Sequence, residues 1–212
     1  MSFGTYARKT RDPSLPYGSR INALAGCVQR YQPVGYQVTF AYLEHVAGNF
    51  RRDEAALLRA MGMLSSSRDI WLLELGDYAR RRAEEKREGQ RNPRATELNP
   101  TSSTCWYGDQ RNAATFALGY LLRRIAKGRT VRTDAAGTEV LSLASGCVEN
   151  GGRLGQAERE RLDHLWLQFE RQRAVAGWPD IDWPSWRKAH DSLWILHLIK
   201  CASPSGTADR TG

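Results

Sequence analysis

Residues 161–170 read RLDHLWLQFE, and they carry the clearest structural pattern in the chain. The apolar side chains in and around this stretch recur at intervals of three and four residues: Leu162, Leu165, Trp166 and Phe169. Such spacing places them on one face of a helix, whereas a half-buried strand would alternate every second residue. The pattern predicts a helix over about 156–176 with one buried face, closed by Gly177.

Weaker versions of the same pattern occur on both sides of this helix. They predict one helix that begins at Ser19 and ends before Pro33 and a last helix from Pro184 to about Cys201. Four more helices are predicted between them, over 36–47, 53–64, 66–88 and 109–127. The serines at 65–67 are expected to stop one helix and cap the next. The chain is therefore predicted to be mainly α, a bundle-like array of six or seven helices.

The period changes after Gly128, and two alternatives stay open there. Residues 130–133 and 138–143 are suited to two short strands of a β-hairpin near 130–143. Because two strands alone are marginally stable, a helix that starts at Ala135 is the competing prediction.

The chain is expected to be organised around one domain. Residues 1–18 hold Pro13, Pro16 and two glycines with little periodicity, which predicts a mobile N-terminal arm. Residues 19–201 form the helical domain, with an internal loop at 89–104 where any two lobes would divide. Residues 202–212 are polar and predict a flexible tail.

Composition restricts the class of protein. The 212 residues are 41% hydrophobic, which is enough for a sizeable core, and no apolar run approaches the 18 residues that would span a bilayer. The first twenty residues carry no secretory pattern, so a cytoplasmic protein without membrane insertion is expected. Four cysteines stand far apart in the sequence and are expected to be reduced.

Positive charge is the first functional signal. The net charge is +8, and 26 of the 31 basic residues are arginines. Clustered guanidinium groups grip phosphates, although a solvated helix face paired with glutamates would carry the same residues. Two segments predict contact with nucleic acid or another polyanion: Arg80, Arg81, Arg82, Lys86, Arg87, Arg91 and Arg94, then Arg123, Arg124, Lys127, Arg129 and Arg132.

Tryptophan is the second signal, because five of the seven lie in the last quarter of the chain. Trp166 and Trp194 fall on predicted buried stripes. The others lie in a turn and at a helix start beside cations, a composition typical of protein-interface hot spots, of core packing or of base stacking. The predicted partner interface is Trp178, Trp183, Trp186, Arg187 and Lys188.

Catalytic and metal-binding patterns are weak. His190, His197 and Cys201 lie seven and four residues apart on the last helix, but they provide too few ligands for a structural zinc site, and His197 is more simply a core histidine. No nucleotide-binding, nucleophile-elbow or metalloprotease motif is present. We expect no metal, no cofactor and no catalytic residue.

Three functions follow, in order of preference. The first is a non-enzymatic accessory or regulatory protein of a bacterial, plasmid or phage system, which binds a protein partner of a larger machine such as one for DNA transfer. The second is a nonspecific DNA- or RNA-binding protein that uses the arginine-rich faces. The third is an enzyme whose site is assembled only in space. Oligomeric state is left open.

Overall fold

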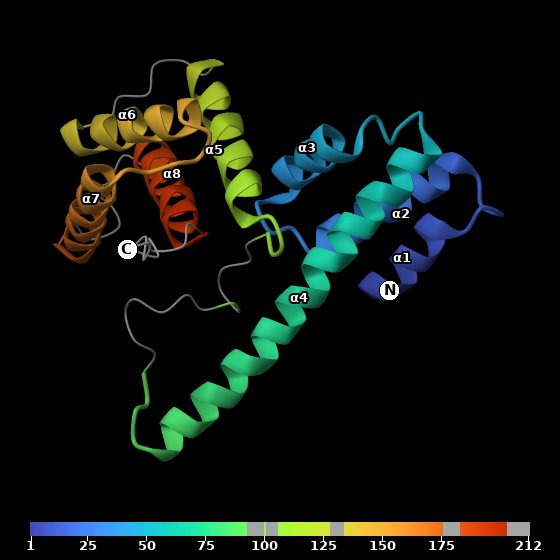
Figure 1. Ribbon diagram of the computed structural model, residues 1–212, viewed down its shortest axis with the longest axis horizontal. Coiled ribbons are helices and arrows are strands. Elements are labelled where there is room, and N and C mark those ends of the chain that lie inside the picture. The colour runs from blue at the N-terminus through green and yellow to red at the C-terminus, as the bar shows by residue number, and fades with distance from the viewer. Residues whose placement is uncertain (93–99, 101–105, 128–133, 176–182, 203–212) are drawn as a thin grey trace, which may run out of the picture. The chain divides into compact units, whose positions relative to one another are not determined.

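The computed structural model describes residues 1–92, 100, 106–127, 134–175 and 183–202; for 170, 172–175 and 183–187 it describes only the backbone. Within those ranges every regular element is an α helix and there are eight, which confirms the mainly α prediction. They are α1 (Phe3–Arg11), α2 (Tyr17–Arg30), α3 (Tyr36–Ala47), α4 (Glu54–Arg87), α5 (Gln110–Lys127), α6 (Ala135–Glu149), α7 (Gln156–Val175) and α8 (Trp183–Ala202) (Figure 1).

The contacts between residues gather into two compact units, Met1–Asp109 and Gln110–Gly212. The first unit holds α1 to α4 and the second holds α5 to α8. The sequence was expected to give one domain over 19–201, with 89–104 as the only place for a division. The observed boundary lies a few residues beyond that loop.

In the first unit, α1 and α2 pack against each other and both contact α4. The buried side chains of this core include Leu24, Cys27, Leu57, Met61 and Leu64. They occupy one side of α2 and of the first half of α4, which explains why those two helices pair.

The N-terminal segment predicted as a mobile arm is instead the helix α1. Ser2 caps it by accepting a hydrogen bond from the Thr5 backbone N–H at 3.3 Å, and Phe3, Ala7 and Thr10 are buried. Their spacing of four and three residues is helical. The prolines that suggested an arm lie after Arg11, where they end α1 and precede α2.

The serines at 65–67 do not interrupt α4, which continues through them for 34 residues. Ser67 is buried, and its hydroxyl lies 2.8 Å from the Tyr31 hydroxyl and accepts from the Tyr107 backbone N–H at 3.0 Å. A serine that bonds other elements does not compete with its own helix for backbone groups. The predicted break and cap are therefore wrong.

In the second unit, α8 contacts α5, α6 and α7, and its Leu193, Leu196 and Ile199 are buried. The last helix is therefore central to this unit. Leu162, Leu165 and Phe169 of α7 are buried as their spacing predicts, whereas Trp166 is half-buried.

The second strand of the predicted hairpin does not form, because residues 138–143 belong to α6. Asp134 caps this helix by accepting a hydrogen bond from the Gly137 backbone N–H at 2.7 Å. Residues 130–133 lie outside the described part of the chain. The competing prediction, a helix from Ala135, is the correct one.

Candidate binding surfaces

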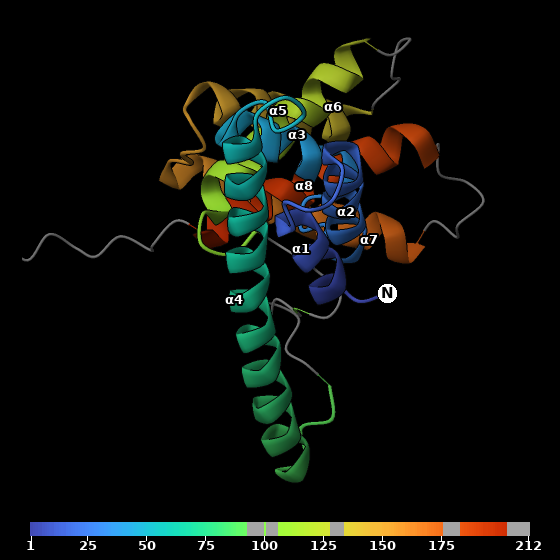
Figure 2. The same ribbon diagram turned by 90° about the vertical axis from the view of Figure 1, so that its right-hand side faces the viewer.

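The second half of α4 extends past α1, α2 and α3, as both ribbon views show (Figures 1 and 2). Residues 69–92 hold six basic and six acidic side chains, so the basic residues of the predicted segment are balanced by acids along the helix. Arg80, for example, forms an ion pair with Asp77 one turn earlier. This pattern is that of a solvated helix with local ion pairs.

Arg82 departs from the prediction of an outward phosphate contact. Its exposed fraction is 6%, it forms an ion pair with Glu85, and its Nη2 donates to the carbonyl oxygens of Gln90 at 3.3 Å and Arg91 at 2.9 Å. These bonds hold the residues after α4 against the end of the helix. Arg82 therefore has a structural role.

The other members of this predicted segment differ in their surroundings. The guanidinium of Arg81 lies 5.5 Å from the centre of the Tyr78 ring, and Nε of Arg87 donates to the Ala83 carbonyl at 3.3 Å. Lys86, Arg87 and Arg91 are exposed, and Arg94 lies outside the described residues.

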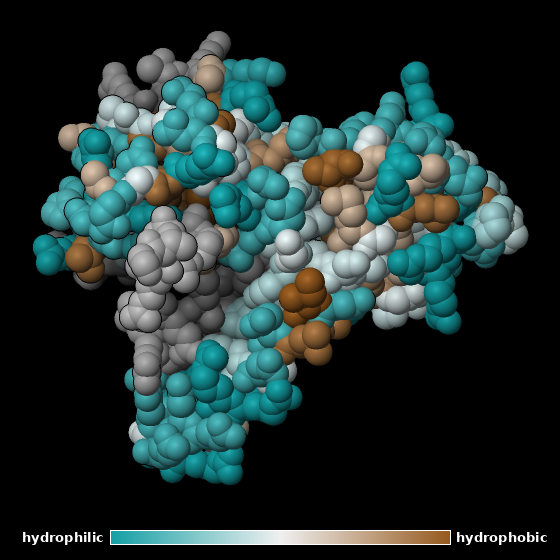
Figure 3. Space-filling view, viewed as in Figure 1, coloured by the Kyte–Doolittle hydropathy of each residue, from teal (hydrophilic) through white to brown (hydrophobic). Residues whose placement is uncertain are grey.

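Between the core of the first unit and the charged end of α4 lies a turn of apolar residues, Ile70–Leu73, which we name the exposed turn of α4. The exposed fractions of Ile70, Leu72 and Leu73 are 38%, 40% and 70%. Figure 3 shows hydrophobic side chains on the surface over the middle of this helix.

Trp71 is the member of this turn that packs inward. Its indole N–H donates to the Pro100 carbonyl at 3.0 Å, and its ring centre lies 5.5 Å from that of Tyr31. Consecutive helical residues point about 100° apart, so Ile70, Leu72 and Leu73 cover the remaining sides of the helix.

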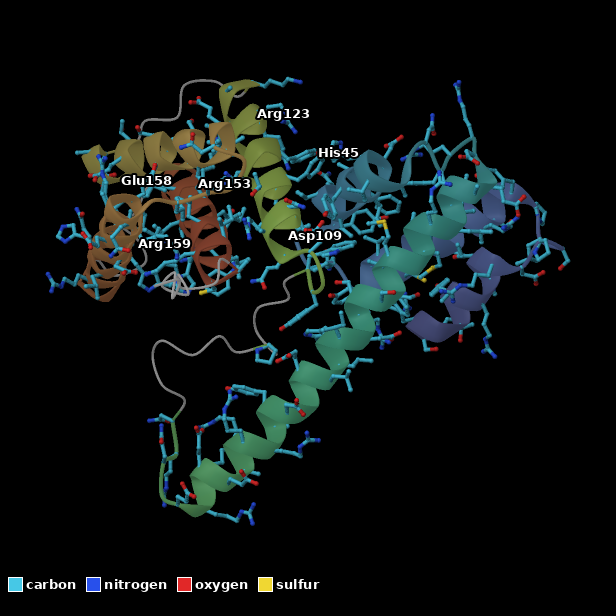
Figure 4. The ribbon with its side chains drawn as sticks, in the orientation of Figure 1. His45, Asp109, Arg123, Arg153, Glu158 and Arg159 are labelled. Carbon is cyan, nitrogen blue, oxygen red and sulfur yellow. The ribbon has the colours of Figure 1, made fainter. Side chains whose placement is uncertain are left out.

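The second predicted basic segment lies at the end of α5. Arg123, Arg124 and Lys127 are exposed there, with Arg123 labelled in Figure 4. Arg129 and Arg132 fall outside the described ranges. Among the residues that the structure describes, no carboxylate lies within 4.0 Å of Arg123 or Lys127.

Asp109, the last residue of the first unit, forms a hydrogen bond within that unit. Its carboxylate accepts a hydrogen bond from the Tyr42 hydroxyl at 3.1 Å; Asp109 is labelled in Figure 4. Burial and the negative charge of Asp109 together raise the pKa of Tyr42 far above its usual value. Tyr42 therefore stays protonated and acts as a buried donor.

Most of the predicted tryptophan interface lies beyond what the structure describes. Trp178 is in an undescribed segment, and Trp183, Trp186 and Arg187 belong to the first turn of α8, where only the backbone is described. Lys188 is half-buried.

His197 lies among aromatic side chains of the second unit. Its ring centre is 5.0 Å from that of Trp166 and 6.0 Å from that of Trp194, and its Nε2 is 3.6 Å from the Cys201 sulfur. Burial, with a smaller effect of Lys200, lowers the pKa of His197, and burial raises the pKa of the Cys201 thiol. A protonated thiol beside a neutral imidazole is a poor nucleophile.

His190 does not complete a metal site with this pair. No group of three or more His, Cys, Asp or Glu side chains that could hold a metal ion occurs among the residues described. Of the three residues considered in the sequence, His197 and Cys201 are the two in contact.

Sequence reasoning missed the basic side chains near the N-terminus. The first thirty residues hold five basic residues and only one acidic residue, Asp12. That imbalance is visible in the sequence, but the five residues are dispersed, and the segment had been interpreted as an arm.

Comparison with protein-family models, curated proteins and solved structures finds no match to this chain.

Proposed function

We propose that this protein is a non-enzymatic accessory factor that binds a protein partner stoichiometrically, and that the partner docks on the exposed turn of α4. The observation that carries the proposal is the exposure of Ile70, Leu72 and Leu73 within a single helical turn. Burying a leucine side chain contributes about 1.5–3 kcal/mol, so this turn offers a partner a large apolar contribution.

The surroundings of the turn favour a protein rather than a small ligand. Asp69 precedes Leu73 by one turn, and Asp77 and Arg80 follow it on the same side of the helix. An apolar centre with a charged rim is the usual anatomy of a protein interface. Trp71, fixed by Pro100 and Tyr31, holds the turn in a defined orientation.

The predicted contribution of Trp178, Trp183, Trp186, Arg187 and Lys188 to partner binding stays a prediction. Its members are indoles and cations of the type that dominate interface energies. We also keep the prediction that the partner belongs to a bacterial, plasmid or phage system.

Site-specific crosslinking tests the proposal. A photoreactive phenylalanine analogue at position 73 should form one dominant covalent adduct with a protein in extracts of the native host, and nuclease treatment should leave that adduct unchanged. Leu167 of α7 is the matched control, because its exposed fraction is 56% and it is also a helical leucine. The analogue at position 167 should give no such adduct.

Two results would contradict the proposal. One is the same adducts from both positions, which would mean that exposed leucines in general attract proteins. The other is an adduct at position 73 that contains only a second copy of this chain, which would assign the exposed turn to self-association.

A further inference from the structure

Four basic side chains from three helices lie around α1, and we name them the N-terminal cation group: Lys9 and Arg11 of α1, Arg30 of α2 and Arg68 of α4. Lys9, Arg11 and Arg30 are exposed, and Arg68 is half-buried. The contacts between α1, α2 and α4 bring these helices side by side. Residues as far apart in the sequence as Lys9 and Arg68 therefore contribute to one surface.

Arg30 and Lys9 approach the same residue, Met1. Nε of Arg30 donates to the Met1 carbonyl at 2.7 Å, and Nζ of Lys9 lies 3.6 Å from the Met1 sulfur. Arg30 also donates through Nη1 to the Gly26 carbonyl at 3.1 Å, and its guanidinium lies 4.6 Å from the centre of the Tyr6 ring. The aromatic face and the two carbonyls fix the guanidinium in place.

Arg68 and Arg11 flank α1 from the side of α4. The guanidinium of Arg68 lies 4.5 Å from the centre of the Phe3 ring. Nη2 of Arg11 donates to the Ser65 hydroxyl at 3.0 Å, and Ser65 lies one turn before Arg68 on α4. At the start of α1, the guanidinium of Arg68 therefore lies against Phe3, and at its end the side chain of Arg11 is held by Ser65 of α4.

The positive charges of the three arginines also act on one buried group, the thiol of Cys27. Burial raises the pKa of Cys27 to about 11, and the positive charges of Arg11, Arg30 and Arg68 oppose this rise.

Unlike Arg20 and Arg59 of the same unit, the members of the N-terminal cation group form no ion pair with a described carboxylate. Among the residues that the structure describes, no carboxylate lies within 4.0 Å of its members, whereas Arg20 pairs with Glu54, and Arg59 with Asp53. Asp12, the nearest acid in sequence to Arg11, accepts hydrogen bonds from the backbone and hydroxyl of Ser14. Each guanidinium has five N–H donors, so donors remain on all three arginines.

We infer that the N-terminal cation group binds consecutive phosphates of a nucleic-acid backbone without reading the base sequence. Guanidiniums held over aromatic rings lose little further freedom when they bind, and their paired donors match phosphate oxygens. The nine residues of α1 extend about 13 Å, which corresponds to about four steps of 3.4 Å along the axis of a duplex. A single phosphate ion would engage only neighbouring members of the group.

This inference is independent of the proposed docking on α4, and it differs from the predicted tracks at 80–94 and 123–132. It uses cations that are unpaired, dispersed in the sequence and gathered by folding. Binding of this kind is driven by counterion release, so its salt dependence reports how many phosphates are contacted.

Fluorescence anisotropy with a labelled 20-base-pair duplex and the full-length protein tests the inference. Binding should weaken steeply between 50 and 200 mM NaCl, and duplexes of scrambled sequence should bind equally. The double variant Arg30→Gln/Arg68→Gln should bind at least about tenfold more weakly at low salt and should lower the slope of log K against log salt by about 2.

The matched control is Arg59→Gln/Arg80→Gln, which removes the same charge from arginines that are paired with Asp53 and Asp77. Its affinity should change less than about threefold, and its salt slope should stay that of the wild type. If Arg30→Gln/Arg68→Gln unfolds by circular dichroism, Lys9→Gln/Arg11→Gln serves instead, with the same expected loss of slope.

Three outcomes would overturn the inference. They are no DNA binding at 50 mM NaCl, an equal loss of affinity in the variant and its control, and binding to vesicles of anionic phospholipid without binding to DNA. The last result would assign the group to a membrane surface.

Discussion

At the scale of single residues, Gly26 decides how α1 lies on α2. A Cβ atom at this position would lie 2.7 Å from Cδ1 and Cε1 of Tyr6, far closer than carbon atoms normally approach. The absent side chain lets the Tyr6 ring lie directly on α2, where the same ring carries Arg30. The packing of Tyr6 against Gly26 therefore also sets the position of the ring on which Arg30 lies.

Replacing Gly26 with alanine should destabilise the protein by about 1–2 kcal/mol, because the cost of overpacking against Tyr6 exceeds the gain in helix propensity. Urea denaturation monitored by circular dichroism measures this difference. Gly62 of α4 is the matched control, since no atom lies within 4 Å of its hypothetical Cβ. Gly62→Ala should stabilise by about 0.5–1 kcal/mol. Gly26→Ala as stable as Gly62→Ala would refute the coupling.

At the scale of helices, the sequence predicted elements that bury a continuous stripe of their own. The helices at 36–47 and 156–175 match their predicted ranges within a residue or two because their apolar side chains repeat locally. The prediction was wrong for α1 and for the middle of α4. Phe3 and Ser67 gain their packing and hydrogen-bond partners from residues distant in the sequence, which local periodicity does not reveal.

The same distinction between local and distant neighbours applies to the candidate sites. Arginines adjacent in sequence, as at 80–82, are the easiest to notice, but that stretch also carries its acids and buries Arg82. Arg11, Arg30 and Arg68 are isolated in the sequence, and only the packing of α1 against α2 and α4 gathers them. A count of charge over the first thirty residues was the available signal.

The end of α4 offers a test of burial against exposure within one run of arginines. Arg82→Ala should lower the free energy of unfolding by about 1–3 kcal/mol, since it leaves Glu85 and the carbonyls of Gln90 and Arg91 without their donor. Arg80→Ala should change it by less than about 0.5 kcal/mol, because the pair with Asp77 is exposed to solvent. Thermal or urea denaturation measures both. If both variants changed the free energy of unfolding equally, the contacts of Arg82 with Glu85, Gln90 and Arg91 would not contribute to stability as proposed.

At the scale of the whole molecule, two helical units together carry a net charge of +8. A positive field accelerates encounter with acidic partners and polyanions, whereas affinity depends on the groups that become buried on contact. We therefore propose two separate roles: contact with phosphates for the arginines around α1, and apolar contact with a protein for the exposed turn of α4.

None of the described helices is long and apolar enough to cross a bilayer. The apolar residues of the exposed turn belong to a helix whose flanking turns are densely charged. A protein partner is the explanation that we propose for their exposure.

The most direct test is isothermal titration calorimetry with the partner that crosslinking identifies. The purified partner is titrated against the wild-type protein, the Leu72→Gln/Leu73→Gln variant and the Leu167→Gln variant. The Leu72→Gln/Leu73→Gln variant should bind about 10- to 100-fold more weakly than the wild type, since each leucine contributes on the order of 1 kcal/mol or more when buried and 1.4 kcal/mol is tenfold in affinity. Leu167→Gln should bind as the wild type does. The same dissociation constant for all three would contradict the assignment of the exposed turn.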